Sequence, residues 1–123
     1  NKNRHLWPNY STQVFLKKNQ HDVILIDGRF RVACALNCIL HAPAHCKIII
    51  HDFWNRPHSH VVLKFFTTLE RVDTMGVFTI KVAVDIKEVK RLLCKYQYLP
   101  NDMTLKDKIG QRLVSLCHRF KKV

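Results

Sequence analysis

The feature that most constrains this chain is a pair of short apolar runs that each lead into an aspartate. The first run, Val23–Ile26, precedes Asp27, and the second, Ile48–Ile50, is followed closely by Asp52. Both runs are rich in isoleucine and lack polar alternation, which is typical of parallel strands buried on both faces. Residues 31–41 lie between them and carry apolar side chains at helical spacing. This order predicts two parallel strands joined by a right-handed helical crossover.

Further elements are predicted after the second strand. Pro57 opens a second helix, because its missing N–H is not needed at a helix start, and the apolar face of that helix runs to Val72. Residues 75–82 predict a third strand, and Asp85 caps a helix that runs to about Tyr98. The predicted fold class is therefore α/β, with a small, mostly parallel sheet of three to four strands flanked by helices.

The two ends of the chain differ from its centre. Residues 1–20 are basic and aromatic, and we expect an irregular arm there, followed by a single α/β domain over residues 21–123. The C-terminal part of that domain, residues 84–123, is expected to be helical. Its last helix begins at Thr104, and its expected apolar face consists of Leu105, Ile109, Leu113, Leu116, Cys117 and Phe120.

Length and charge limit the functions open to the chain. Its 123 residues suffice for one small domain but not for a large cofactor-binding fold of roughly 200 residues or more. A hydrophobic content of 47% excludes a disordered tail. The 21 Lys and Arg against 9 Asp and Glu give a net charge of +12, which points to a polyanionic partner, and RNA is one candidate.

Cysteine usage and hydropathy bear on the compartment. The chain has five cysteines, an odd number that excludes a fully paired disulfide framework within one chain. Reduced thiols indicate an intracellular protein, either cytoplasmic or organellar. No apolar run approaches the roughly 18 residues that a membrane span needs, so no membrane is expected among the partners.

Polar side chains gather where the two predicted parallel strands end, which is where ligands bind in open α/β sheets. Asp27, His51 and Asp52 are the candidate catalytic residues, and the two carboxylates could share a divalent cation. Arginines in the same segments could instead hold a phosphate or carboxylate. A plainer alternative is that each aspartate caps the following helix or closes a loop with an arginine. The candidate ligand-binding residues are Gly28, Arg29, Arg31, Trp54, Asn55, Arg56 and His58.

The stretch that runs from Ile26-Asp27-Gly28-Arg29-Phe30-Arg31 to Ile50-His51-Asp52 resembles the second half of a class I, S-adenosylmethionine-dependent methyltransferase-like Rossmann fold. The resemblance covers about residues 20–82. It implies that Asp27 and Asp52 occupy positions that hold a metal or position substrate in metal-dependent members. In that family the cofactor sits on the first half, at a glycine-rich turn, and no such turn precedes Asp22. The resemblance therefore implies S-adenosylmethionine binding only if the missing half is supplied.

Three functional hypotheses remain open. The first is a partial methyltransferase-like domain without catalysis of its own. Such a domain would be a fragment of a longer enzyme, a reused scaffold or a chain completed by a partner. The open edge of the first strand favours pairing with a protein partner or a second copy. The second hypothesis is a basic, RNA-binding structural subunit of a ribonucleoprotein. The third is a small enzyme that acts on a phosphorylated ligand between Asp27 and Asp52.

Overall fold

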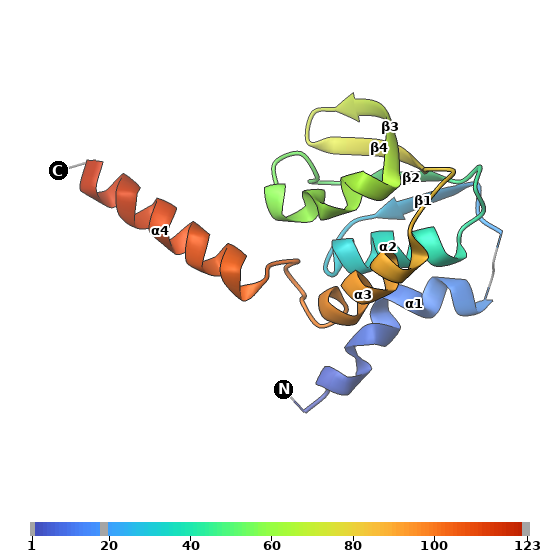
Figure 1. Cartoon of the computed structure of the whole chain (residues 1–123), viewed down its shortest axis with the longest axis horizontal. Helices are drawn as coiled ribbons and strands as arrows, with labels where there is room; N and C mark the ends of the chain where they lie inside the picture. Colours follow the sequence, from blue (N-terminus) through green and yellow to red (C-terminus); the bar gives the residue numbers. More distant parts are fainter. Residues whose placement is uncertain (1, 18–19, 122–123) are drawn as a thin grey trace.

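The computed structural model describes residues 2–17 and 20–121, and within these it leaves out the side chains at positions 17, 114 and 116–121 (Figure 1). The helices and strands follow in chain order as η1 (Arg4–Leu6), α1 (Trp7–Lys17), β1 (Val23–Ile26), α2 (Arg31–His41), β2 (Lys47–Ile50), η2 (Pro57–Phe65), β3 (Phe66–Val72), β4 (Met75–Ile80), α3 (Ile86–Tyr96) and α4 (Leu105–Lys121), where η marks a 3-10 helix.

The sheet has four strands in the spatial order β1-β2-β4-β3. As predicted, β1 and β2 are parallel, with Ile24 opposite Ile48 and Ile26 opposite Ile50. The strand β4 runs antiparallel to both of its neighbours, β2 and β3. The α/β class is confirmed, but the sheet is mixed, and the prediction of a mostly parallel sheet is wrong.

The error comes from the segment predicted as a second helix. A 3-10 helix covers Pro57–Phe65, and the chain then extends as β3, which pairs with β4 across a turn at Asp73 and Thr74. Apolar residues recur here at three- and four-residue spacing, which imitates a helix. Thr67 and Thr68 are β-branched and favour a strand. Asp73 adopts a left-handed φ of 54°, which allows the chain to reverse.

The helix α2 is the centre of the helical layer. Its side chains at Ala33, Ala35 and Leu36 are fully buried, and α1 and α3 both pack against it on one side of the sheet (Figure 1). The N-terminal segment is helical where an irregular arm was expected. Its helix is held by burial of Phe15 in the core and by ring contact between Trp7 and Phe30.

The sheet buries one of its faces much more completely than the other. Ile48, Ile50 and Phe78 alternate into the core and are at most 1% exposed. Leu25, which is opposite Ile49 in β2, points the other way and is 64% exposed. A strip of apolar side chains across β1 and β2 therefore lies partly open to solvent.

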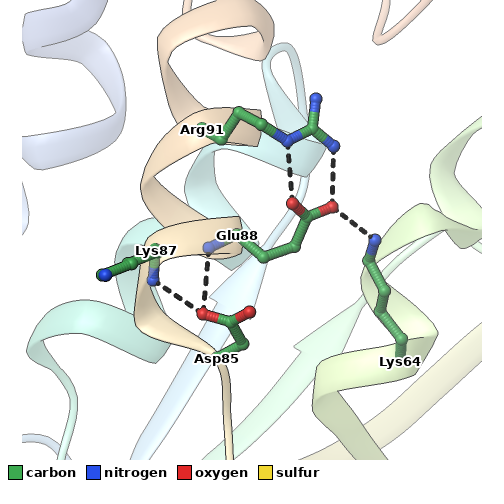
Figure 2. Close-up of polar contacts among 5 residues, drawn as sticks. All are labelled: Lys64, Asp85, Lys87, Glu88 and Arg91. Atoms are coloured by element: carbon green, nitrogen blue, oxygen red, sulfur yellow. Dashed lines mark hydrogen bonds and ion pairs between the residues drawn. The ribbon is translucent and has the colours of Figure 1, made fainter.

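Two acidic side chains fix α3 (Figure 2). Asp85 accepts hydrogen bonds from the backbone N–H groups of Lys87 and Glu88, which confirms the predicted cap. The Glu88 carboxylate accepts hydrogen bonds from Arg91 at 2.7 Å and from Lys64 of η2 at 2.9 Å. Hydrogen bonds from Arg91 and Lys64 lower the pKa of Glu88 to about 2. This ion-pair group links α3 to η2.

The last helix, α4, extends away from the rest of the molecule (Figure 1). Its predicted start is confirmed, because Thr104 and Asp107 exchange hydrogen bonds of 2.8–3.2 Å. Its apolar face is not packed on the body, since Leu105, Ile109 and Leu113 are 76%, 53% and 58% exposed. None of the helices in the described ranges is long and apolar enough to cross a membrane. The remaining residues of the expected apolar face lie outside the described side chains: Leu116, Cys117 and Phe120.

Candidate functional site

Five polar side chains meet where β1 and β2 end, and we call them the strand-tip cluster: Asp27, Arg31, His51, Asp52 and Arg56. They come together because parallel neighbouring strands deliver the residues that follow them to the same edge of the sheet. The Nδ1 atom of His51 lies 3.2 Å from an Asp27 oxygen and 3.7 Å from an Asp52 oxygen. The structure thus brings the two aspartates to one histidine, which lies between them.

Arg31 is the buried member of the cluster, with only 7% of its surface exposed. Its Nε donates a 3.1 Å hydrogen bond to the backbone carbonyl of His51, and its guanidinium lies 3.8 Å from Asp27. Arg56 is more exposed and lies 3.9 Å from Asp52. Each aspartate is therefore paired with the arginine four residues later, and Arg31 also ties the end of β1 to the end of β2.

The backbone at both strand tips adopts left-handed conformations. Gly28 has a φ of 124°, a conformation that favours glycine, and a Cβ added there would lie 3.0 Å from the Tyr10 hydroxyl. Asp52 has a φ of 50°, and its carboxylate accepts a 3.2 Å hydrogen bond from the Thr74 hydroxyl in the β3–β4 turn. The hairpin that the sequence did not predict therefore helps to hold the second strand tip.

The charges of the cluster balance one another, because two arginines face two carboxylates. A divalent cation between Asp27 and Asp52 would have to displace the His51 ring and compete with both arginines. Within the described ranges no group of three or more His, Cys, Asp or Glu side chains is placed to hold a metal ion. The geometry therefore fits a divalent ion poorly.

Trp54 takes part in packing the hairpin rather than in the cluster. Its indole Nε1 donates a 3.2 Å hydrogen bond to the Met75 carbonyl, and the Arg71 guanidinium lies over its ring at 4.6 Å. Trp54 was predicted to bind a ligand, and in the structure its ring already has Arg71 over it.

Three other candidate residues lie outside the cluster. Arg29 and Asn55 are exposed in the loops that follow β1 and β2. His58 is half-buried at the start of η2 and lines a shallow hollow between η2 and α4. Burial lowers the pKa of His58, and the nearby Arg56 cation lowers it further. Their positions in the sequence show that they follow the strands, but not the directions of their side chains.

Asp102 is a structural residue of this region that sequence reasoning missed. Its carboxylate accepts a 2.9 Å hydrogen bond from the backbone N–H of Val32, in the first turn of α2. The N-cap residue of α2 is Phe30, and the N-cap residue of η2 is Arg56. Neither side chain forms a capping hydrogen bond. The aspartates at the strand tips therefore do not cap the helices that follow them. A partner 70 residues away leaves no local signal in the sequence.

A small hollow of about 210 Å³ lies beside β1, between α1 and α2. Apolar side chains from these three elements line it, including Val14, Phe15 and Ile24, and Asp27 and Arg29 also contribute. Two cysteines complete the lining, and burial raises the pKa of the Cys34 thiol to about 12. That thiol is therefore protonated at neutral pH and is a poor nucleophile. The described cysteines are all free: Cys34, Cys38, Cys46 and Cys94.

The β1–α2–β2 unit and the antiparallel hairpin together form a four-stranded α/β fold with polar side chains at the strand tips. A crystal structure of a methyltransferase-like protein from Silicibacter pomeroyi matches with a TM-score of 0.68 and 23% sequence identity, over 79% of this chain. The match covers 51% of that protein, so the chain spans about half the length of the solved structure. No protein-family model matches the chain, and no curated protein matches its sequence. At this identity the likeness shows the fold alone.

Proposed function

We propose that this chain is the part of a methyltransferase-like domain that lies beyond the cofactor-binding half, and that it has no catalysis of its own. A second polypeptide segment would complete it along β1. The observation that carries the proposal is the outer edge of β1, because in the described part of the chain no strand pairs with it. The match to only 51% of the solved structure supports the same proposal.

The hydrogen bonds of β1 show which of its groups remain to be paired. Lys47 donates its N–H to the Asp22 carbonyl, and His51 donates its N–H to the Ile26 carbonyl. In a parallel ladder, alternate residues bond to the same neighbouring strand, so the N–H groups of Val23 and Leu25 point away from β2. These groups are what an added strand would bind.

The side chains around this edge are also suited to being covered. Val23 and Leu25 are the first and third residues of β1, and their side chains lie on one face of the strand, 54% and 64% exposed. The hollow between α1 and β1 lies along the same edge and has room for an apolar side chain. An added strand would therefore gain both backbone hydrogen bonds and apolar contacts.

Calorimetric titration of S-adenosylmethionine into the isolated chain tests the lack of autonomous function. We expect no binding heat and no change of melting temperature, because the sequence lacks the glycine-rich turn that would hold the cofactor. Binding with a dissociation constant in the micromolar range would contradict the proposal. A circular dichroism spectrum with both helix and strand signals would show that the titrated chain is folded.

Hydrogen exchange of the β1 amides tests whether the outer edge is open. In the isolated chain we expect the Val23 and Leu25 amides to exchange at least about 100-fold faster than those of Ile24 and Ile26, which bond to β2. Leu25→Lys is a control for the stability of the fold. A charge at this exposed edge position should change the free energy of unfolding by less than about 0.5 kcal/mol. Equal protection of all four amides at high dilution would show that the chain covers its own edge, and the proposal would fail.

A further inference from the structure

We propose that α4 is an interfacial helix that binds the surface of an anionic lipid bilayer. This inference concerns a part of the molecule remote from β1, and it does not depend on the function proposed above. It also revises the sequence-based expectation that no membrane is involved. That expectation rested on the lack of a spanning segment, whereas a helix that lies on the bilayer surface needs no such length.

The first observation is an apolar stripe that the rest of the molecule leaves exposed. Leu105, Ile109 and Leu113 recur every four residues, so at about 100° per residue they lie within about 80° of arc on one side of the helix. All three are more than half exposed. Three large aliphatic side chains in a row on a projecting helix form a continuous apolar surface of about two and a half turns.

The second observation is the position of the basic residues relative to this stripe. On the same helical projection, Lys108 and Arg112 border one side of the stripe and Lys106 borders the other. Lys and Arg side chains can place their charge at phosphate depth while their aliphatic stems follow the apolar residues inward. Within the described side chains, none of these three cations forms an ion pair. Arg91 on α3, by contrast, is bound to Glu88.

The third observation is the direction that the stripe faces. One side of α4 faces η2 and lines the hollow between the two helices. The residues on this side are Lys106, Asp107, Gly110 and Gln111. Leu105, Ile109 and Leu113 do not line this hollow. The apolar stripe therefore faces outward and is available to an external surface.

Charge complementarity indicates which kind of partner binds the apolar stripe. A second copy would bring like charges together along both borders of the stripe, on chains that each carry a net charge of +12. A nucleic acid would pair with the cations but would leave the aliphatic stripe in water. A bilayer that contains anionic lipid offers phosphate groups and hydrocarbon side by side, and its extended negative surface also attracts the remaining positive charge of the chain.

Vesicle flotation of the whole chain tests the proposal. We expect binding to vesicles of phosphatidylcholine with about 30 mol% phosphatidylserine, and little binding to phosphatidylcholine alone. Ile109→Gln with Leu113→Gln keeps the net charge and the helix propensity but removes the apolar surface, and should weaken binding more than about ten-fold. Lys108→Glu with Arg112→Glu should do the same. Its matched control, Lys87→Glu with Lys90→Glu on α3, makes an equal charge change away from the stripe and should weaken binding less than about three-fold.

Three results would overturn the proposal. If the glutamine variant floats with the vesicles as the parent does, the stripe does not enter the bilayer. If the parent binds polyuridine rather than vesicles and the glutamine variant binds it equally well, α4 is a nucleic-acid surface. If the parent elutes as a dimer that the glutamine substitutions dissociate, and neither protein binds vesicles, the stripe is an interface between copies. All of these substitutions are at exposed positions, and circular dichroism will confirm that each variant is folded.

Discussion

Replacing Phe53 by alanine is expected to lower the free energy of unfolding by about 3–5 kcal/mol, since it empties a fully buried aromatic position. Phe53 directly follows Asp52, and its ring lies 4.9 Å from Phe78, 4.9 Å from Trp54 and 4.8 Å from His60, measured between centroids. These rings come from the loop, from η2 and from β4. The substitution would therefore loosen the contact that holds the second strand tip against the hairpin.

Urea denaturation of the parent and the variant measures this effect. Phe53→Leu retains most of the apolar volume and should cost less than about 2 kcal/mol, which separates the loss of a cavity-filling group from the loss of the ring itself. A change of under 1 kcal/mol for Phe53→Ala would show that the aromatic cluster does not support the fold. In that case the loop that carries His51 and Asp52 must be held by other contacts.

Asp102 is expected to make stability fall as the pH rises through weakly acidic values. Burial raises the pKa of its carboxyl from 3.8 to about 6, although the hydrogen bond from Val32 and the charge of Arg31 act in the opposite direction. One carboxylate oxygen, Oδ2, is buried without a hydrogen-bond partner among the described residues. The ionised form is therefore disfavoured in the folded chain.

The sign of the effect follows from the two pKa values of this group. Between pH 3.8 and about 6 the folded chain keeps the proton on Asp102 while the unfolded chain has released it. The folded state binds more protons in that window, so stability declines with rising pH and is constant again above it. At about 1.4 kcal/mol per pKa unit, the Asp102 contribution to this decline is about 2–3 kcal/mol.

Asp102→Asn is the variant that isolates this contribution. Asparagine can still accept the hydrogen bond from Val32, tolerates the left-handed φ of 58°, and does not titrate. Unfolding free energies of the parent and the variant, measured from pH 4 to pH 7, should differ by an amount that changes by about 2–3 kcal/mol across that range. A difference that stays constant with pH would refute the assignment. Asp102→Ala, which loses the cap, should be less stable than the asparagine variant at every pH.

The parts of the fold that were predictable from the sequence are those with local causes. The strands β1 and β2 follow from continuous apolar runs, and the starts of α3 and α4 follow from side chains such as Asp85 and Thr104, which cap them. The hairpin was missed because the spacing of its apolar residues is also compatible with a helix. Only β-branched residues such as Thr67 indicate a strand instead. The helix α1 was missed because burial of Phe15 against distant elements stabilises it.

The strand-tip site was predictable only in outline. Two parallel strands that end in aspartates imply that Asp27 and Asp52 lie close together. The position of His51 between them, and the burial of Arg31 beneath them, depend on strand register and on tertiary packing. Asp102 was not predictable, because a cap supplied from 70 residues away depends on the path of the whole chain.

The open edge of β1 has a consequence for how the isolated chain behaves at high concentration. An unpaired strand edge beside exposed apolar side chains is a template for association between copies. The net charge of +12 opposes such association by keeping the molecules apart. This protection depends on ionic strength, since charges are screened over about 10 Å at 0.1 M salt but over only about 3 Å at 1 M. We therefore expect copies of this chain to aggregate through β1 at high salt concentration and to remain monomeric at low salt concentration.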